Sequence, residues 1–312
     1  MEFLDDDDNG GFYTLDLRSD AKAQVVNLRA GGISDVYGHD GTLIIARGAV
    51  LETAQTGSAG DWVTGNDAAS TIRSNNGNDT VRTGIGFDTI YGGDNDDQLF
   101  GEGQADAIYG DAGNNSLVGA QGFDLISGGS GNDSLYGGTE EDWMFGAIEN
   151  DTLWGGQGFD ILSGGGQNDS LFGSSEEDWG FGGTANDVVD GGAGNDYVFG
   201  GIGNDTLLGG DNNDRLKGEG GNDSPTGGTG ADSFVFLSNI GIDVITDFSP
   251  STGRECINLT AASAIGTFSE LIANWMAAAV HGTDMLINLG GGNSITLASV
   301  KYGALTQDQF LV

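Results

Sequence analysis

The sequence contains very few of the residues that form cross-links or carry common catalytic chemistry. It has one cysteine, Cys256, among 312 residues, so no disulfide can form within the chain. Its two histidines, His39 and His281, are 242 positions apart, which excludes the zinc motif that needs two imidazoles one helical turn apart. The chain has no G-x-S-x-G segment, and Cys256 has no histidine near it in sequence. We therefore expect no catalytic residues.

Basic residues and long apolar runs are also scarce. Ten Lys and Arg residues stand against 47 Asp and Glu residues, which gives a net charge of −37. This charge argues against nucleic acid and against anionic membrane surfaces as partners. No apolar run approaches the length of a membrane span, and the N-terminus lacks the pattern of a secretory signal. We therefore expect no membrane span.

Glycine and aspartate are abundant, and both follow a strict period of nine residues. Eighteen units run from Ser74 to Val235 without insertion or deletion, and residues 56–73 supply two more in the same phase. Position one is Gly in sixteen of the eighteen units, and position six is Asp in all but one, where it is Asn115. Position eight is apolar except at Gly180 and Pro225. The negative charge is thus placed at fixed sites that could take cations.

The period also predicts the local structure. We expect residues one to six of each unit to form a turn and residues seven to nine a short strand, with position eight inward and positions seven and nine outward. Two units then complete one coil, and the coils stack into two parallel sheets around the apolar residues from Val81 to Leu171. Glycine suits the turns because the backbone there must adopt positive φ and direct its carbonyls to one spot.

The unit follows the pattern G-G-x-G-x-D-x-U-x and so resembles the calcium-binding repeat of RTX proteins. The resemblance implies an all-β fold, a parallel β-roll that binds multiple Ca²⁺ ions. Calcium also suits the donors, because it is a hard cation that takes six to eight oxygens. A single turn offers too few ligands, so we expect each ion between turns two units apart, for example Asp196 with Asp214 or Asp205 with Asp223.

The candidate calcium ligands are the aspartates of position six and the first glycine of the four turns that match the pattern best. They are Asp79, Asp88, Asp97, Asp106, Asp124, Asp133, Asp142, Asp151, Asp160, Asp169, Asp178, Asp187, Asp196, Asp205, Asp214, Asp223 and Asp232, with Gly128, Gly191, Gly200 and Gly227.

Three units carry a glutamate at position four, where glycine is usual: Glu140, Glu149 and Glu176. Such a glutamate could add a ligand. It could also distort the turn and leave a weak or empty site, because its Cβ opposes positive φ.

A longer repeat of 36 residues lies over the nonamer, since Gly119–Trp154 and Gly155–Asp190 agree at 21 of 36 positions. It places apolar residues on the outer face of one sheet. This candidate partner face carries Leu125, Trp143, Ile161, Trp179 and Tyr197 at position seven, with Phe145, Phe181 and Phe199 at position nine. Exposed apolar stripes often mark contact surfaces. Another part of the chain could cover the face, or its rings could stack as a ladder; it could also bind a protein partner, a second copy or a glycan.

The composition of the flanks predicts three domains. Residues 1–55 form an N-terminal β cap, with strands expected at 25–28, 33–36 and 43–45, and residues 56–235 form the β-roll. Residues 236–312 form a C-terminal β cap. In this cap we expect one short helix, from a capping box of Thr267 and Glu270 to Gly282, and a hairpin around residues 290–293. His39 is expected in a turn, and His281 at the end of the helix.

Several flanking segments resemble the C-terminal domain of serralysin-type metalloproteases. They include Asn27–Val36, Ile45–Ala54, Gly230–Phe236 and Ile245–Phe248, and the ending Asp308–Val312 is similar to the family's terminal secretion motif. The resemblance implies a secreted, extracellular protein that the type I secretion apparatus exports through an uncleaved C-terminal signal. The chain departs from the family in two ways: its array is far longer, and the protease motif is missing.

These observations predict a non-catalytic calcium-binding β-roll that stays unfolded in calcium-poor cytoplasm and folds outside the cell. Two alternatives remain. The chain could be the secretion and folding module of an enzyme whose catalytic domain is absent, or an adhesin or matrix protein that uses the Trp143 and Trp179 face. A lyase or epimerase acting on acidic polysaccharide is disfavoured, because the net charge repels a polyanion.

Overall fold

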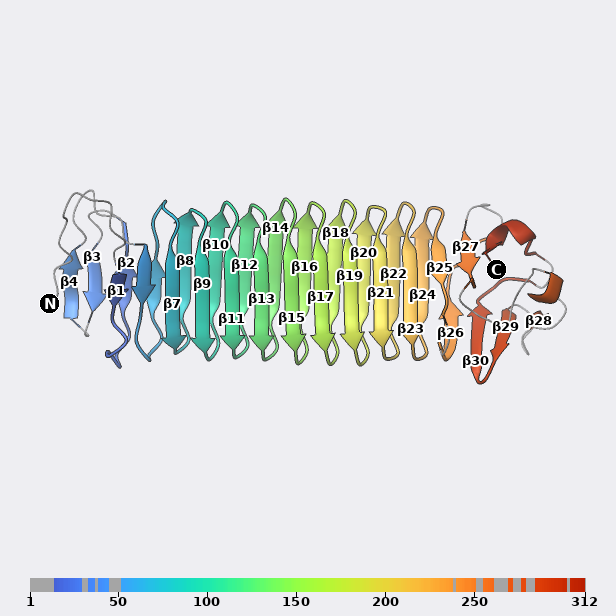
Figure 1. Ribbon diagram of the computed structural model, residues 1–312, viewed down its shortest axis with the longest axis horizontal. Coiled ribbons are helices and arrows are strands. Elements are labelled where there is room, and N and C mark those ends of the chain that lie inside the picture. The colour runs from blue at the N-terminus through green and yellow to red at the C-terminus, as the bar shows by residue number, and fades with distance from the viewer. Residues whose placement is uncertain are drawn as a thin grey trace. The chain divides into compact units, whose positions relative to one another are not determined.

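The computed structural model describes residues 14–29, 33–36, 39–44, 52–237, 240–250, 255–260, 269–271, 276–278, 284–301 and 304–311. The chain divides into two compact units, Met1–Thr152 and Leu153–Val312, and each is described by itself. Nearly all of the regular structure is β-strand, which confirms the all-β fold class (Figure 1).

Unit 1 is a parallel β-solenoid in which successive strands alternate between two sheets. The strand order is β1-β5-β7-β9-β11-β13-β15 in one sheet and β14-β12-β10-β8-β6-β2 in the other. At the N-terminal end, β2, β3 and β4 pair antiparallel. The strands are β1 (Thr14–Asp16), β2 (Val25–Asn27), β3 (Ile33–Val36), β4 (His39–Ile44), β5 (Thr53–Gln55), β6 (Trp62–Thr64), β7 (Thr71–Asn76), β8 (Thr80–Ile85), β9 (Thr89–Asp94), β10 (Gln98–Gly103), β11 (Ala107–Ala112), β12 (Ser116–Gln121), β13 (Leu125–Ser130), β14 (Ser134–Thr139) and β15 (Trp143–Ile148).

Unit 2 continues the same architecture and adds a small cap. One sheet has the order β17-β19-β21-β23-β25-β27-β31, the other contains β18-β20-β22-β24, and the cap sheet has the order β26-β30-β29-β28. The elements are β16 (Thr152–Gln157), β17 (Ile161–Gly166), β18 (Ser170–Ser175), β19 (Trp179–Thr184), β20 (Val188–Ala193), β21 (Tyr197–Ile202), β22 (Thr206–Asp211), β23 (Arg215–Gly220), β24 (Ser224–Thr229), β25 (Ser233–Val235), β26 (Ile242–Ile245), β27 (Cys256–Asn258), β28 (Met276–Ala278), β29 (Met285–Gly290), β30 (Asn293–Leu297), the 3₁₀ helix η1 (Gln307–Gln309) and β31 (Phe310–Leu311).

The division of each unit into turn and strand differs from the sequence-based expectation. The full repeat strands span six residues, from position seven through position three of the next unit, and only positions four to six form the turn. The pairing shows the reason: Asn75 and Asn76, at positions two and three, still lie in parallel register with Gly93 and Asp94. A three-residue strand was therefore too short a prediction.

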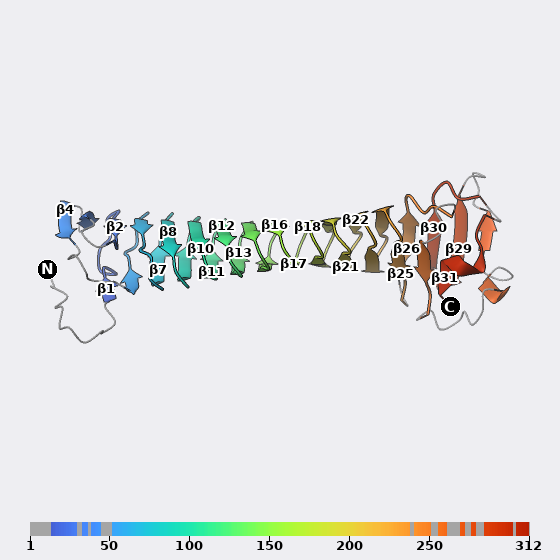
Figure 2. The ribbon, with the colours of Figure 1, turned by 90° about the horizontal axis from the view of Figure 1, so that it is seen from above.

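Position eight forms the interior of both units, as expected. The strands of each unit lie in two facing rows (Figure 2), and the side chains between them, from Val81 to Leu171, are essentially inaccessible to solvent. Register keeps them stacked, because Leu99 pairs with Val81 on one side and Leu117 on the other. Burial of one such side chain contributes about 1.5–3 kcal/mol, so the column is the main apolar stabilisation of a chain this rich in glycine.

The flanks agree with the sequence only in part. The hairpin of β29 and β30 forms as expected. The predicted helix is wrong in its second half, since Met276–Ala278 is strand β28 and pairs with β29. Within the predicted range, helical conformation is described only at residues 269–271. Sheet pairing thus overrides an apolar pattern of helical period. His39 begins strand β4 and is not in a turn. Thr267, Gly282 and His281 lie outside the described residues.

The three-domain organisation, with boundaries at residues 55 and 235, stays a prediction, because the division into compact units falls within the array. The helical residues that the structure describes include no helix long and apolar enough to cross a membrane.

Candidate metal centres

The position-six aspartates form two columns in each unit, one along each row of turns. All of them are buried. Inside each unit, Oδ1 of each successive aspartate accepts a hydrogen bond from the backbone amide of the position-six residue one coil earlier. Asp214 accepts from Asp196 at 2.9 Å, and Asp223 accepts from Asp205 at 3.0 Å. The two aspartates of each pair expected to share an ion are therefore neighbours within a column, and the two pairs lie in different columns.

The second carboxylate oxygen, Oδ2, is buried and accepts no hydrogen bond from a described residue. A buried charged oxygen without a partner is costly, so a regular series of them indicates a missing positive charge. This arrangement holds for Asp79, Asp88, Asp97, Asp106, Asp124, Asp133, Asp178, Asp187, Asp196, Asp205, Asp214, Asp223 and Asp232.

Glycine at position one lies directly against the second carboxylate oxygen of its own unit. A methyl group on Gly200 would overlap Oδ2 of Asp205 and would lie 2.8 Å from the carbonyl oxygen of Gly218 in the next coil. A methyl group on Gly128, Gly191 or Gly227 would likewise overlap Oδ2 of Asp133, Asp196 or Asp232. Position one is thus glycine because a side chain would fill the space between a carboxylate and a carbonyl. Positions two and four are the ones that adopt positive φ.

Asn115 shows which interaction the second carboxylate oxygen of the aspartate units lacks. Its Oδ1 accepts from the amide of Asp97 at 2.9 Å, as an aspartate would. Its Nδ2 replaces the second oxygen and donates to the carbonyl oxygen of Gly113, at position four, at 3.2 Å. In an aspartate unit, the corresponding oxygen and carbonyl are both acceptors. A bound cation can satisfy both of them, but a further hydrogen bond between them cannot form.

The pKa values follow from the same burial. Desolvation is the main cause that raises the pKa of Asp178 to about 8. The hydrogen bond from the amide of Asp160 opposes this shift, and the neighbouring carboxylates of Asp160 and Asp196 add to it. Desolvation likewise raises the pKa of Asp106 and Asp214 to about 8. At neutral pH these columns therefore need either protons or cations to neutralise their carboxylates.

The donor set fits calcium. Each site would offer a position-six carboxylate, position-one and position-four carbonyls, and the carboxylate of the adjacent coil, all of them hard oxygen ligands. No group of three His, Cys, Asp or Glu side chains converges in the described part of the chain, because backbone carbonyls supply much of the set. When bound, the ion would supply the positive charge that the columns lack. The assignment of each residue as a ligand stays a prediction.

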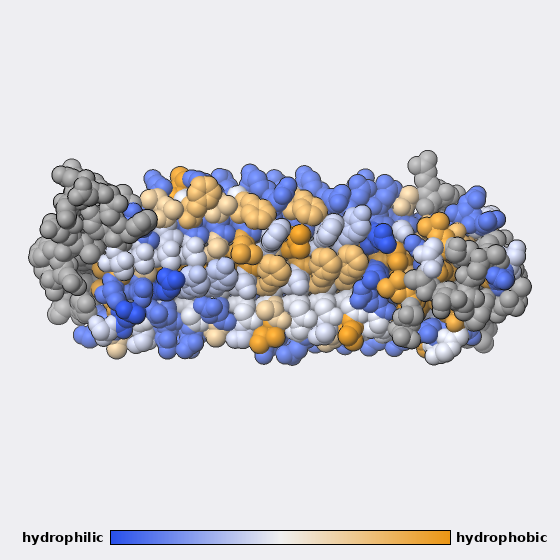
Figure 3. Space-filling view, in the orientation of Figure 1, coloured by the Kyte–Doolittle hydropathy of each residue, from blue (hydrophilic) through white to orange (hydrophobic). Residues whose placement is uncertain are grey.

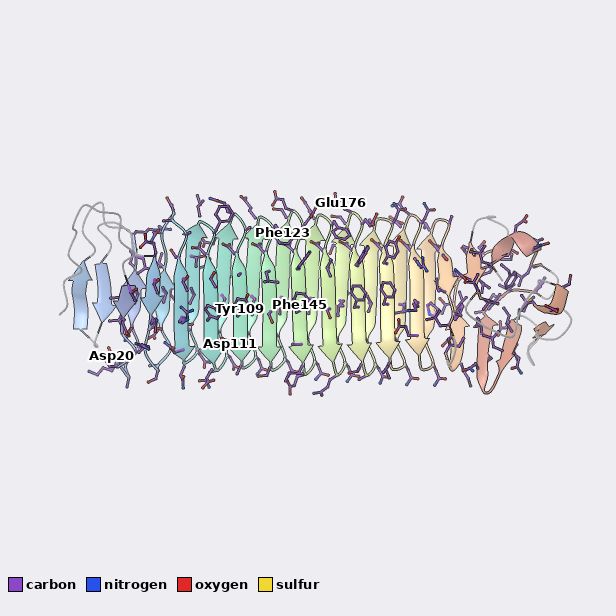
Figure 4. The ribbon with its side chains drawn as sticks, viewed as in Figure 1. Asp20, Tyr109, Asp111, Phe123, Phe145 and Glu176 are labelled. Carbon is purple, nitrogen blue, oxygen red and sulfur yellow. The ribbon has the colours of Figure 1, made fainter. Side chains whose placement is uncertain are left out.

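The position-four glutamates do not distort their turns, and a role for them as calcium ligands stays a prediction. Glu140, Glu149 and Glu176 adopt φ of +74°, +75° and +71°, so the turn retains its left-handed backbone. Each carboxylate accepts a hydrogen bond from a position-four backbone amide one coil earlier. For Glu176 this amide is that of Gly158, at 3.0 Å. Figure 4 shows Glu176 on the rim of turns, where its carboxylate braces two coils.

The columns extend beyond the nonapeptide array, which the sequence analysis missed at the C-terminal end. Oδ1 of Asp243 accepts from the amide of Asp223 at 2.9 Å, although twenty residues separate them. Desolvation raises the pKa of Asp243 to about 7. The available signal was the triplet Asp243-Val244-Ile245, in which the third residue is buried as position eight is. At the other end, Asp61 accepts from the amide of Gln24 at 2.7 Å.

The apolar outer face exists in both units as stacked rings. In unit 1, Leu125 pairs with Trp143, whose ring meets Phe123 edge to face at 5.5 Å, and Phe145 projects from β15 (Figure 4). In unit 2, Ile161 pairs with Trp179, and Trp179 with Tyr197. Trp143 and Trp179 remain 43% and 37% exposed, so ladder stacking holds these rings without burying them. A partner for this face stays a proposal.

Comparison with known proteins gives two results. The family model of the RTX calcium-binding nonapeptide repeat matches eight overlapping segments: residues 55–90, 73–108, 82–117, 109–144, 118–153, 145–179, 172–207 and 200–234. Serralysin from Photorhabdus laumondii is 42% identical over 66 residues, and metallopeptidase AprA from Pseudomonas marginalis is 39% identical over 66 residues. Each alignment covers 21% of this chain and only 14% of the relative's length.

Proposed function

The chain belongs to the family of RTX calcium-binding nonapeptide-repeat proteins, and we propose that it is a secreted β-roll that folds when it binds extracellular Ca²⁺. In this proposal its role is non-catalytic, and it is exported by a type I secretion apparatus. The observation that carries the proposal is the series of buried Oδ2 atoms that accept no hydrogen bond from a described residue. A cation bound only by the folded chain adds its binding free energy to folding.

Calcium concentration would then act as the switch between export and folding. In the cytoplasm, unneutralised carboxylates destabilise the coils and keep the chain unfolded. Outside the cell, calcium at about 10⁻⁴–10⁻³ M, the affinity range of extracellular calcium modules, neutralises the columns and drives folding.

The terminal segment supports this order of events. Phe310, within the segment similar to a secretion motif, is buried in the folded chain, and β31 pairs with β27. The side-chain amide of Gln309 donates to the carbonyl oxygen of Pro250 at 3.1 Å. A transporter that recognises the Phe310 side chain would find it accessible only before the chain folds, so export would precede calcium binding.

A calcium titration followed by far-UV circular dichroism tests the folding switch, with EGTA reversal and magnesium as controls. We expect a coil without calcium, a cooperative gain of β structure with it, and little response to magnesium. A chain already folded in EGTA would contradict the switch. Export is tested separately by deleting residues 308–312 in a bacterium that carries a type I apparatus. Undiminished export would contradict that part of the proposal alone.

A further inference from the structure

An open groove of about 390 Å³ lies on the outer face of unit 2, over β19, β21 and β23. Its walls are aromatic: Trp179 and Tyr197 come from position seven, and Phe181 and Phe199 from position nine. Alternate residues of a strand face the same side of a sheet, so the two pairs of rings stand along opposite sides of the groove. Its volume falls within the range of small-molecule sites.

The rings form a preorganised surface. Phe181 and Phe199 stack at 4.8 Å between centroids with planes 5° apart, and Trp179 lies 5.2 Å from Tyr197 with planes 51° apart. Because each ring is held by its neighbour in the next coil, a ligand that enters pays little to order them. The walls suit a flat, apolar body that can pack against aromatic faces and edges.

One end of the groove is positively charged. Arg215 and Lys217 lie on β23, next to the rings, and between residues 83 and 253 they are the only basic residues of the chain. Figure 3 shows hydrophobic side chains over β19 and β21 and a hydrophilic patch beyond them over β23. In a chain of net charge −37, the placement of both cations beside one aromatic groove is specific evidence for an anionic ligand group.

The two cations differ in whether a carboxylate of the chain already pairs with them. Lys217 forms an ion pair with Glu219 at 2.6 Å, and its Nζ lies 5.7 Å from the centroid of Phe199. The guanidinium of Arg215 makes no hydrogen bond or ion pair with any residue in the described ranges, and its side chain is exposed. Arg215 is therefore the group available to a carboxylate, which a guanidinium can bind through two parallel hydrogen bonds.

We propose that this groove binds an amphipathic monoanion, an aromatic ring system that carries one carboxylate. The ring packs between the two pairs of aromatic side chains, and the carboxylate binds Arg215. A polyanion fits poorly, because the cations occupy only one end and further carboxylates would meet an acidic surface.

The test uses 2-naphthoate and its uncharged analogue 2-naphthamide, each titrated by calorimetry into the folded, calcium-loaded protein. We expect saturable binding of one naphthoate per chain and at least tenfold weaker binding of the amide. Arg215→Gln should weaken naphthoate binding at least tenfold, and Arg215→Lys should weaken it less. Trp179→Ser should weaken the binding of both ligands, because it removes part of the aromatic wall of the groove.

Arg82→Gln is the matched control, because it removes the same charge outside the groove. Arg82 lies over Phe100 at 3.9 Å and pairs with Glu102 at 3.3 Å in unit 1. It should leave naphthoate binding unchanged. Circular dichroism in calcium establishes that each variant is folded, which separates this test from that of the folding switch. The proposal is wrong if the folded protein does not bind naphthoate, if the amide binds equally, or if Arg82→Gln acts like Arg215→Gln. Self-association that Trp179→Ser abolishes and naphthoate does not inhibit would also overturn it.

Discussion

The side-chain amide of Asn115 donates to the carbonyl oxygen of Gly113 at 3.2 Å, in the position where the other units of the array present an aspartate oxygen. Asn115 keeps the remaining contacts of its column, because its Oδ1 accepts from Asp97 and its backbone amide donates to Asp133 at 2.7 Å. This unit therefore closes its turn with a hydrogen bond and needs no cation. It provides a natural comparison with the aspartate units.

We expect Asn115→Asp to make this turn dependent on calcium. In EGTA the variant should be less stable by about 1–3 kcal/mol, because a buried acceptor loses its partner. In calcium at a hundredfold excess over the dissociation constant, a newly bound ion would contribute about 2.7 kcal/mol. Thermal unfolding in EGTA and in calcium measures both effects. Asn132→Asp, on the exposed rim one coil later, is the control and should show neither effect, because the Asn132 side chain only accepts hydrogen bonds, as a carboxylate can.

Gly128 and Gly103 distinguish a glycine that the fold requires from one that it does not. A methyl group on Gly128 would overlap Oδ2 of Asp133, so Gly128→Ala should displace that carboxylate and destabilise the folded chain by about 1–3 kcal/mol. The calcium midpoint of the dichroism titration should rise. Gly103→Ala is the control, because its nearest contact is Ile85 Cγ1 at an ordinary 3.9 Å. It should change stability by less than about 0.5 kcal/mol. Equal effects would contradict the proposed role of position one.

The calcium-free chain should gain structure as the pH falls. Desolvation raises the pKa of Asp79 to about 8 and that of Asp97 to about 7, well above the ordinary value of an unfolded aspartate. Groups with a raised folded pKa stabilise the fold below the unfolded pKa, near 4, and this contribution is lost as the pH rises through 6 to 8.

In EGTA, far-UV circular dichroism should therefore show more β structure at pH 5 than at pH 8. In calcium the trend should reverse, because protons compete with the ion for the same carboxylates, and the calcium midpoint should rise at acidic pH. If the chain in EGTA unfolds further on acidification, the carboxylates are not buried as the structure describes.

The strict period of the array made the fold predictable. Because position eight is apolar at nearly every unit, both the interior column and the register of the sheets follow from the spacing alone. The flanks lack this redundancy. The segment that ends in Met276–Ala278 has apolar residues at helical spacing, but its pairing with β29 depends on residues that are distant in sequence.

The candidate site was predictable in its residues but not in its contacts. The spacing indicated that Asp196 and Asp214 are neighbours, whereas the hydrogen bond that joins them uses a backbone amide that no pattern identifies. Asp243 was missed because a two-residue insertion breaks the period while the column continues in space. The groove beside Arg215 was missed because its rings and cations belong to three coils, and only the stacking of those coils brings them together.

Glu176 occupies a left-handed turn position where the repeat usually has glycine, and its side-chain hydrogen bonds explain how. At φ +71° glycine would be less strained, but the carboxylate of Glu176 accepts hydrogen bonds from the Gly158 amide at 3.0 Å and from the Ser175 hydroxyl at 2.8 Å. These bonds lower the pKa of Glu176, that from Gly158 most. We expect Glu176→Ala to lower the melting temperature most, because alanine keeps the backbone strain and loses both bonds.

Glu176→Gly should lower the melting temperature less, because the relief of backbone strain offsets part of the loss of the two hydrogen bonds. Glu176→Gln should have the melting temperature closest to that of the unsubstituted chain. Differential scanning calorimetry in calcium gives the order. If alanine is tolerated as well as glutamine, the carboxylate does not brace the two coils. If instead Glu176→Gln alone lowers the number of bound ions, the glutamate is a calcium ligand, and its hydrogen bond to Gly158 is replaced when the ion binds.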